Sequence, residues 1–142
     1  VAQLKKLPSF VERRRHNFAH LRAALADMED AFILPEATEH ANPSWFGFLL
    51  TCRAGIRRAK IVHYIESKGI QTRMLFAGNL TKHPCFDAMR RAGEGYRIAD
   101  TLTETDRIMN DTFWLGVYPG LTDEKIDFIS QTVKDAVRGQ RN

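Results

Sequence analysis

The sequence predicts an α+β domain, in which a small sheet of three or four mostly antiparallel strands has helices packed on it. The length of 142 residues suits a single domain, because domains most often contain about 100–150 residues. Apolar residues recur at helical spacing near both ends of the chain. Between these ends lie short runs with the alternation of buried and exposed strand residues. Helices that flank a block of short strands indicate one layer of helices on a sheet.

The first helix is expected from Ser9 to about Met28. Ser9 and Glu12 have the spacing of a capping box, in which each side chain satisfies a free backbone donor of the other residue. Pro8 disfavours a helix that runs in from upstream. The apolar stripe of this helix consists of Val11, Phe18, Leu21, Leu25 and Met28. We therefore divide the chain into a connecting tail over 1–8 and a domain over 9–142.

Three strands and one helix are expected over 32–76. A short apolar strand over 32–34 stops at Pro35, and a second strand is expected over 44–52. Alternation places Phe46, Phe48, Leu50 and Cys52 on one face of it and Trp45, Gly47, Leu49 and Thr51 on the other. A helix over 57–68 ends at Gly69, which suits a left-handed cap. The third strand spans 70–76 and breaks at Ala77-Gly78-Asn79.

The last third of the chain is expected to add a strand and further helices. Pro84 can begin a short helix that stops at Gly93. Thr103 and Asp106 have the pattern of an N-terminal cap for a helix that ends near Asn110. A fourth strand over 112–117 follows, and Thr122 caps a final helix. The apolar stripe of that helix consists of Ile126, Ile129, Val133 and Val137.

Composition restricts the class of protein. No run approaches the roughly 18 apolar residues of a membrane span, and two distant cysteines suit a reducing cytoplasm. The formal charge of +4 gathers in the runs 13–16 and 57–60. Basic runs of this kind fit either a solvated helix face or a patch that attracts phosphate or nucleic acid. Neither run is interleaved with aromatic residues, so the solvated face is favoured and no nucleic-acid partner is expected.

Familiar catalytic and metal motifs are not found in the sequence. Neither glycine-rich phosphate loop nor a G-x-S-x-G nucleophile elbow occurs. His16 and His20 are four residues apart on the first helix, so both could reach one metal ion. Arginines surround them and the sequence indicates no third ligand, so they are interpreted as surface residues and no metal site is assigned.

The candidate binding residues lie in three stretches, each with a structural alternative. Arg73 stands on the third strand, before a bend that exposes Asn79, and its guanidinium suits a carboxylate or a diphosphate. The alternative there is a strand followed by a hydrogen-bonded surface turn. Arg107 either points into a cleft or pairs with Asp111 four residues on. The aromatic run Trp45, Phe46 and Phe48 lines either a cleft or the core.

Three longer motifs carry a family resemblance. Pro43-Ser44-Trp45-Phe46-Gly47-Phe48, then the run over 75–81 (LFAGNLT), then the run over 109–121 (MNDTFWLGVYPGL) occur in this order. Together they resemble the C-terminal third of the CDP-4-keto-6-deoxyhexose 3-dehydratases. These enzymes belong to the DegT/DnrJ/EryC1/StrS group of fold-type I enzymes, which depend on pyridoxal phosphate (PLP). The resemblance implies that the chain is the C-terminal small domain of such an enzyme.

The resemblance also implies a function for the complete enzyme. That enzyme would be a cytoplasmic homodimer that uses PLP or pyridoxamine phosphate (PMP) and a 2Fe-2S cluster. It would remove the C3 hydroxyl of a CDP-linked 4-keto-6-deoxysugar during the synthesis of 3,6-dideoxyhexoses for lipopolysaccharide. An electron-transfer reductase would be its partner. The cofactor platform, the catalytic base and the cluster cysteines would lie in a large domain upstream of Val1.

The same resemblance assigns substrate-binding roles within this chain. It implies that Trp45, Phe46 and Phe48 form cleft wall, and that Arg73, Phe76, Asn79 and Arg107 contact substrate. It implies no catalytic residue and no bound cofactor on this chain, which is expected to be inactive alone. Two other functions stay open: the same domain of a sugar-nucleotide aminotransferase, and a free-standing basic module that binds an anionic partner.

Overall fold

The computed structural model describes residues 1–141 and shows a four-stranded antiparallel sheet with helices, which confirms the predicted α+β class. The strands lie in the order β1-β2-β4-β3. The strands span Phe32–Ile33 (β1), Gly47–Cys52 (β2), Thr72–Met74 (β3) and Thr112–Gly116 (β4). The α-helices span Leu7–Ala24 (α1), Arg58–Ser67 (α2), Asp87–Ala92 (α3), Thr103–Asp111 (α4) and Asp123–Arg141 (α5). Short 3₁₀ turns span Leu4–Lys6, Ala26–Met28, Leu80–Lys82 and Pro84–Phe86.

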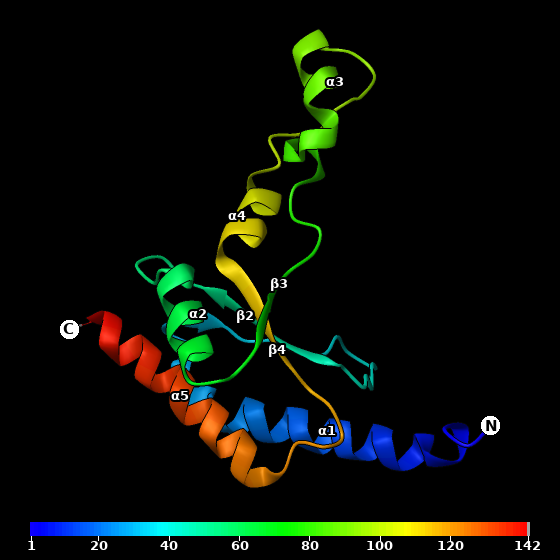
Figure 1. Cartoon of the computed structure of the whole chain (residues 1–142), viewed down its shortest axis with the longest axis vertical. Helices are drawn as coiled ribbons and strands as arrows, with labels where there is room; N and C mark the ends of the chain where they lie inside the picture. The colour runs from blue at the N-terminus through cyan, green and yellow to red at the C-terminus, as the bar shows by residue number, and fades with distance from the viewer. Residues whose placement is uncertain (142) are drawn as a thin grey trace.

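The core lies between one face of the sheet and the helices α1, α2 and α5. Phe48 and Leu50 from β2 and Phe113 and Leu115 from β4 have almost no exposed surface. They meet, in one cluster, Leu21 of α1 and Leu25 just after it, Ile61 and Ile65 of α2, and Ile126 and Val133 of α5. In Figure 1 these three helices gather below and beside the sheet, with α1 and α5 crossing close to one another. The opposite face of the sheet carries none of these three helices.

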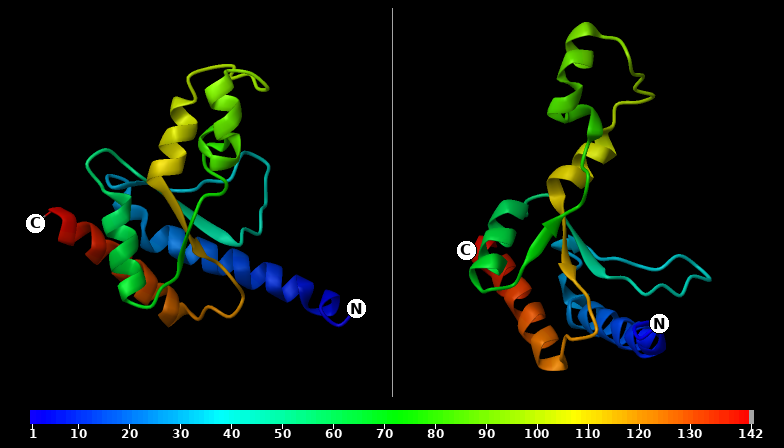
Figure 2. Two further views of the ribbon diagram at one scale, coloured as in Figure 1. Left: turned by 45° about the horizontal axis from the view of Figure 1, so that its top comes forward. Right: turned by 45° about the vertical axis from the view of Figure 1, so that its right-hand side comes forward.

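The α3 and α4 helices form an arm that extends away from the layered part of the domain. Figure 2 shows the chain leaving β3, turning through α3 and returning through α4 into β4. Arg58 of α2 fixes the root of this arm, since its Nη1 donates to the carbonyls of Met109 (2.6 Å) and Thr112 (3.1 Å). A cation that meets the free carbonyls at the end of a helix also interacts favourably with the helix dipole.

Two helix starts differ from the predictions. Helix α1 begins at Leu7 with Lys6 as its N-cap, so Ser9 lies inside the first turn, where its hydroxyl donates to the Lys6 carbonyl at 2.8 Å. Pro8 does not block this start, because the first helical turn needs no N–H at that position. Helix α4 has Leu102 as its N-cap and Thr103 as its first residue, because Asp106 is engaged by the preceding loop instead.

Other predicted ends are confirmed. Thr122 caps α5, since its hydroxyl accepts from the Lys125 N–H at 3.4 Å. Gly69 and Gly93 both have left-handed backbone, with φ of 80° and 71°, just past the ends of α2 and α3. Over the described residues, no helix has both the length and the apolar composition that crossing a bilayer requires.

Candidate functional site

The outer face of the sheet, opposite the core helices, brings three strands together around Trp114. In the ladder Leu49 of β2 and Arg73 of β3 both lie directly opposite Trp114 of β4, one on each side. Residues paired in this way share a face of a sheet. Their neighbours Phe48, Leu50, Phe113 and Leu115 point into the core. Arg73 and the half-buried Trp114 therefore share the face that the helices leave open, and Nη1 of Arg73 donates to the carbonyl of Thr72 at 2.9 Å.

An aromatic hollow lies on this outer face. It has a volume of about 90 Å³ and is lined by Trp45, Phe46, Gly47, Leu49, Leu75, Phe76 and Trp114. The Phe46 ring stands at 90° to that of Trp114, with 5.3 Å between ring centroids. Phe46 and Phe76 remain 60% and 73% exposed. Exposed apolar side chains gathered at a hollow mark a surface that receives a ligand or another protein segment.

Gly47 shapes the floor of the aromatic hollow. A Cβ added there would lie 2.8 Å from Cε3 of Trp114, closer than carbon atoms pack. Gly116, directly opposite in the ladder, has no atom within 4 Å of such a Cβ. Of these two paired glycines, only Gly47 therefore lies against the indole of Trp114.

We expect Gly47→Ala to displace Trp114 and to lower the free energy of unfolding by about 1–3 kcal/mol, as overpacking does. The matched change Gly116→Ala should leave the tryptophan environment unchanged. Urea denaturation followed by tryptophan fluorescence measures both effects. Equal behaviour of the two variants would show that the indole does not pack against Gly47.

The loop after β3 is held to α4 by Asn79, which is 2% exposed. Its Nδ2 donates to Oδ1 of Asp106 at 2.7 Å, and its Oδ1 accepts from the backbone N–H and the hydroxyl of Thr81. Lys82 completes the group, with Nζ 2.8 Å from Oδ2 of Asp106. The hydrogen bonds from Lys82 and Asn79 lower the pKa of the Asp106 carboxyl below its ordinary value. Asn79 therefore positions the loop beside the aromatic hollow.

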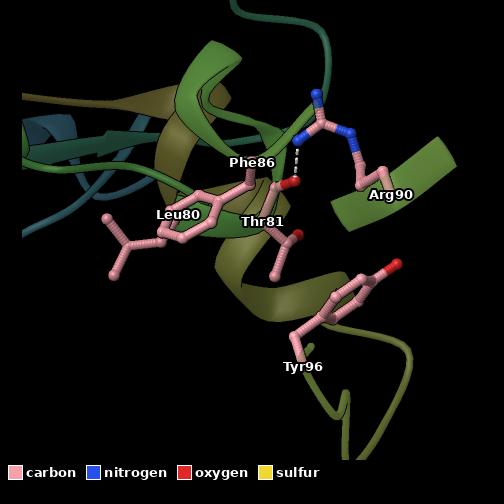
Figure 3. A pocket seen from close by; sticks show the side chains of 5 residues that line it. All are labelled: Leu80, Thr81, Phe86, Arg90 and Tyr96. Atoms are coloured by element: carbon pink, nitrogen blue, oxygen red, sulfur yellow. Dashed lines mark hydrogen bonds between the residues drawn. The ribbon is translucent and has the colours of Figure 1, made fainter. Parts of the chain in front are cut away.

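A second hollow lies in the arm (Figure 3). It has a volume of about 150 Å³ and is lined by Leu80, Thr81, Phe86, Arg90 and Tyr96. The Arg90 guanidinium donates to the carbonyls of Thr81 and His83 and pairs with Asp87. Because its donors are engaged in this way, Arg90 braces the arm and is not a free anion-binding group.

The structure brings some of the predicted binding residues together and places others apart from them. Trp45, Phe46 and Phe76 line the aromatic hollow, and Arg73 shares its face of the sheet. Asn79 lies in the adjoining loop. Arg107 is exposed on α4 and pairs with Glu104 at 3.4 Å, and not with Asp111, the partner in the structural alternative. Arg107 does not line the hollow.

Phe48 is a correction to the predicted cleft wall. It has no exposed surface and packs against Phe18, with 5.0 Å between ring centroids. Phe46 was expected on the same face as Phe48 but contacts Trp114 on the outer side. The Trp45 ring packs at a tilt of 45° against that of Phe18, with 4.5 Å between ring centroids. The regular alternation begins only at Gly47, where the β2 ladder begins.

Trp114 and Leu49 are central to the outer face but were not predicted as site residues. A signal for Trp114 exists in the sequence, because it alternates with the apolar Phe113 and Leu115 within one strand. Such a residue points away from the core face. Which of its neighbours shares that face depends on the strand register, which spacing alone does not give.

The cysteines do not form a cofactor site in this chain. Cys52 is buried in the core, and burial raises the pKa of its thiol to about 12, so it stays protonated. Cys85 is exposed on the arm. A 2Fe-2S cluster is held by four cysteines, or by two cysteines and two histidines that lie together, whereas one of the two cysteines of this chain is buried in the core and the other is exposed on the arm. The residues that line the aromatic hollow include no lysine and no other charged side chain.

Known proteins share both the sequence and the fold of this chain. A 3-dehydratase of dTDP-4-dehydro-2,6-dideoxy-D-glucose from Saccharopolyspora spinosa is 45% identical over 139 residues, which cover 96% of this chain and 29% of that protein. The lipopolysaccharide biosynthesis protein RfbH of Salmonella typhimurium is 46% identical over 131 residues, covering 91% of this chain and 29% of that protein. The chain thus spans less than a third of the length of these relatives.

Solved structures extend the similarity of fold. The GDP-4-keto-6-deoxy-D-mannose-3-dehydratase of E. coli, solved with bound hydrated PLP, superposes with a TM-score of 0.79 at 24% identity. The match covers 93% of this chain and 33% of that one. Residues 1–134 also match the sequence profile described as the DegT/DnrJ/EryC1/StrS aminotransferase family. The chain therefore belongs to the DegT/DnrJ/EryC1/StrS family.

Proposed function

We propose that this chain is the C-terminal small domain of a PLP- or PMP-dependent nucleotide-sugar 3-dehydratase, and that it closes one side of the substrate cleft. The observation that carries this proposal is the identity of 45–46% to the S. spinosa 3-dehydratase and to RfbH. Both matches cover nearly the whole chain but 29% of each relative. On this proposal residues 1–8 connect the domain to a large domain that carries the chemistry.

The outer face supplies the proposed cleft wall. Phe46 and Phe76 are exposed aromatic side chains that can pack on a sugar or base ring, with Trp114 behind them. Arg73 offers a planar guanidinium beside them, suited to the diphosphate of a nucleotide sugar. Asn79 positions the loop that carries Phe76. In this proposal no residue of the chain acts as a catalytic acid or base.

The cofactors belong to the rest of the proposed enzyme. PLP or PMP supplies the electron sink for loss of the C3 hydroxyl, and a 2Fe-2S cluster would pass electrons from a reductase. Neither fits the residues of this chain, so we assign them to the large domain and derive no step from them here. The proposed enzyme is a cytoplasmic homodimer whose substrate is a CDP-linked 4-keto-6-deoxysugar.

A second candidate is a sugar-nucleotide aminotransferase, which the description of the matching family favours. The two functions use the same small domain and differ in the fate of the sugar. A dehydratase removes oxygen at C3, whereas an aminotransferase replaces the ketone oxygen by an amine. The products therefore distinguish the two functions.

Two proteins test the proposal: the 142-residue chain, and the same chain joined to its upstream coding sequence. We expect the chain alone to show neither cofactor absorbance nor turnover. The longer protein should bind PLP or PMP and, with a reductase, remove the C3 hydroxyl. Assays with CDP-, dTDP- and GDP-linked 4-keto-6-deoxysugars identify the nucleotide. A PLP-loaded, active 142-residue chain, or an aminated product, would contradict the dehydratase proposal.

Arg73→Ala tests the cleft wall within the longer protein. Loss of a charge-assisted hydrogen bond to a diphosphate should lower kcat/KM on the order of tenfold to a hundredfold. Arg138→Ala is the matched control, because Arg138 is an exposed arginine on α5 that pairs only with Asp135 among the described residues. Unchanged kinetics of Arg73→Ala, with a folded protein, would remove Arg73 from the site.

A further inference from the structure

Three potential metal ligands converge where α1 passes the start of α5, on the helical side of the domain. His16 and His20 lie one turn apart on α1, and α5 brings Asp123 to them from more than a hundred residues away. Nε2 of His16 lies 3.1 Å from Oδ1 of Asp123, and Nδ1 of His20 lies 4.0 Å from the same oxygen. One ligand atom of each residue lies within 4.8 Å of the other two.

Asp123 supplies the third potential ligand, which the sequence alone did not indicate. Two imidazoles and one carboxylate make a donor set that zinc accepts, with bonds of about 2.0–2.2 Å. In a tetrahedral site such bonds place donor atoms about 3.3 Å apart. The present separations of 3.1 and 4.0 Å need only side-chain adjustments to reach that geometry. Figures 1 and 2 show α1 and α5 side by side in every view.

Asp127 orients His20 for this role. Nε2 of His20 lies 2.9 Å from Oδ1 of Asp127, one turn further along α5. When that nitrogen donates to the carboxylate, Nδ1 keeps its lone pair and faces Asp123. A carboxylate that holds the far nitrogen of a ligating histidine is the usual outer partner of a zinc site.

The arginines near the histidines do not exclude a cation. Nε and Nη2 of Arg15 donate to the carbonyls of Pro43 and Asn42, and Nη1 of Arg14 donates to that of Ser44. Both side chains thus point toward the loop before β2. Arg13 alone of the three contacts the cluster, with Nη2 2.8 Å from Oδ1 of Asp123.

The local charge balance favours a metal ion. Two carboxylates, from Asp123 and Asp127, face one guanidinium, so the surroundings carry an excess of negative charge.

We propose that His16, His20 and Asp123 bind a divalent transition-metal ion, which links α1 to the first turn of α5. Water takes the fourth position, and Asp127 is a positioning residue. The ion and Arg13 compete for the same carboxylate. This site is on the other side of the sheet from the aromatic hollow, so the proposal does not depend on the proposed enzymatic function.

Titration calorimetry with ZnCl₂ on the 142-residue chain tests the site. We expect one equivalent to bind to the wild type and to His63→Ala, a control that removes an exposed histidine from α2. His16→Ala and His20→Ala should each weaken binding by at least about tenfold, and Asp127→Asn by about 10- to 100-fold. Arg13→Gln should tighten binding several-fold, because it removes the competing charge.

Thermal unfolding gives a second readout. Zinc should raise the unfolding midpoint of the wild type and of His63→Ala, because a ligand that binds only the native state stabilises it. The midpoint of His16→Ala and of its polar counterpart His16→Gln should not respond. The proposal is overturned if the wild type binds no stoichiometric zinc, or if the His16 and His20 variants bind as tightly as His63→Ala.

Discussion

Phe48→Ala is expected to lower the free energy of unfolding by about 3–5 kcal/mol, the cost of removing a large aromatic side chain from a core. Phe48 has no exposed surface. It lies directly opposite Leu115 in the sheet and packs against Phe18 of α1, which joins sheet and helix at one point. The cavity left by the substitution would lie between these two layers. A loss of this size removes much of the stability of a typical domain.

Phe46→Ala is the matched control, since Phe46 is two residues away and 60% exposed. Its ring meets only the outer side of the sheet at Trp114, so we expect a loss of about 1 kcal/mol or less. Urea denaturation followed by circular dichroism measures both variants. If Phe48→Ala were as stable as Phe46→Ala, Phe48 would not be a core residue and the original assignment to a cleft wall would regain support.

Asn79→Ala is expected to cost about 2–3 kcal/mol, because three hydrogen bonds disappear and buried polar groups lose their partner. The side chain joins the loop after β3 to Asp106 on α4 and to Thr81. Both the loop and the arm should loosen, and the Phe76 ring on the same loop should lose its fixed place. Denaturation of the 142-residue chain without any ligand measures this effect.

Two further variants show whether Asn79 has this structural role. Asn110→Ala changes an exposed asparagine of α4 and should stay within about 0.5 kcal/mol of the wild type. Asn79→Asp keeps the acceptor for Thr81 but sets a second carboxylate against Asp106. It should destabilise the chain at neutral pH and recover in part as the pH is lowered and one carboxyl takes up a proton. Full stability of Asn79→Ala would leave substrate binding as the remaining role of this residue.

Elements whose pattern is local could be predicted from the sequence. The stripe from Ile126 to Val137 lies in a helix that faces the core, and so does the stripe from Phe18, although α1 ends at Ala24 and Met28 lies in the 3₁₀ turn that follows. Gly69, Gly93 and Thr122 ended or began helices as predicted, because each acts through its own backbone or through residues three positions away. The four strands also lie within their predicted ranges, with shorter ends.

Predictions were wrong where the conformation of a residue depends on a partner far away in the sequence. Thr103 and Asp106 match a cap pattern, yet Asp106 bonds to Asn79, which is 27 residues away. Phe46 and Phe48 have the right spacing to share a face, but the strand ladder begins between them. Similarly, the carboxylate of Asp123 beside His16 and His20 could not be predicted, because Asp123 lies 107 residues from His16. No local pattern contains these pairings.

The two outermost strands are very short, and this limits how copies of the chain can associate. β1 contributes two residues to the sheet and β3 contributes three. A strand from a second molecule that aligned beside either one would find few free amide and carbonyl groups to pair with. Contact through the flat side of the sheet, where Phe46 and Phe76 protrude, buries more apolar area. The short outer strands thus protect the domain from fibre-like growth along the sheet edges, and the aromatic face of the sheet is the broader surface open to contact.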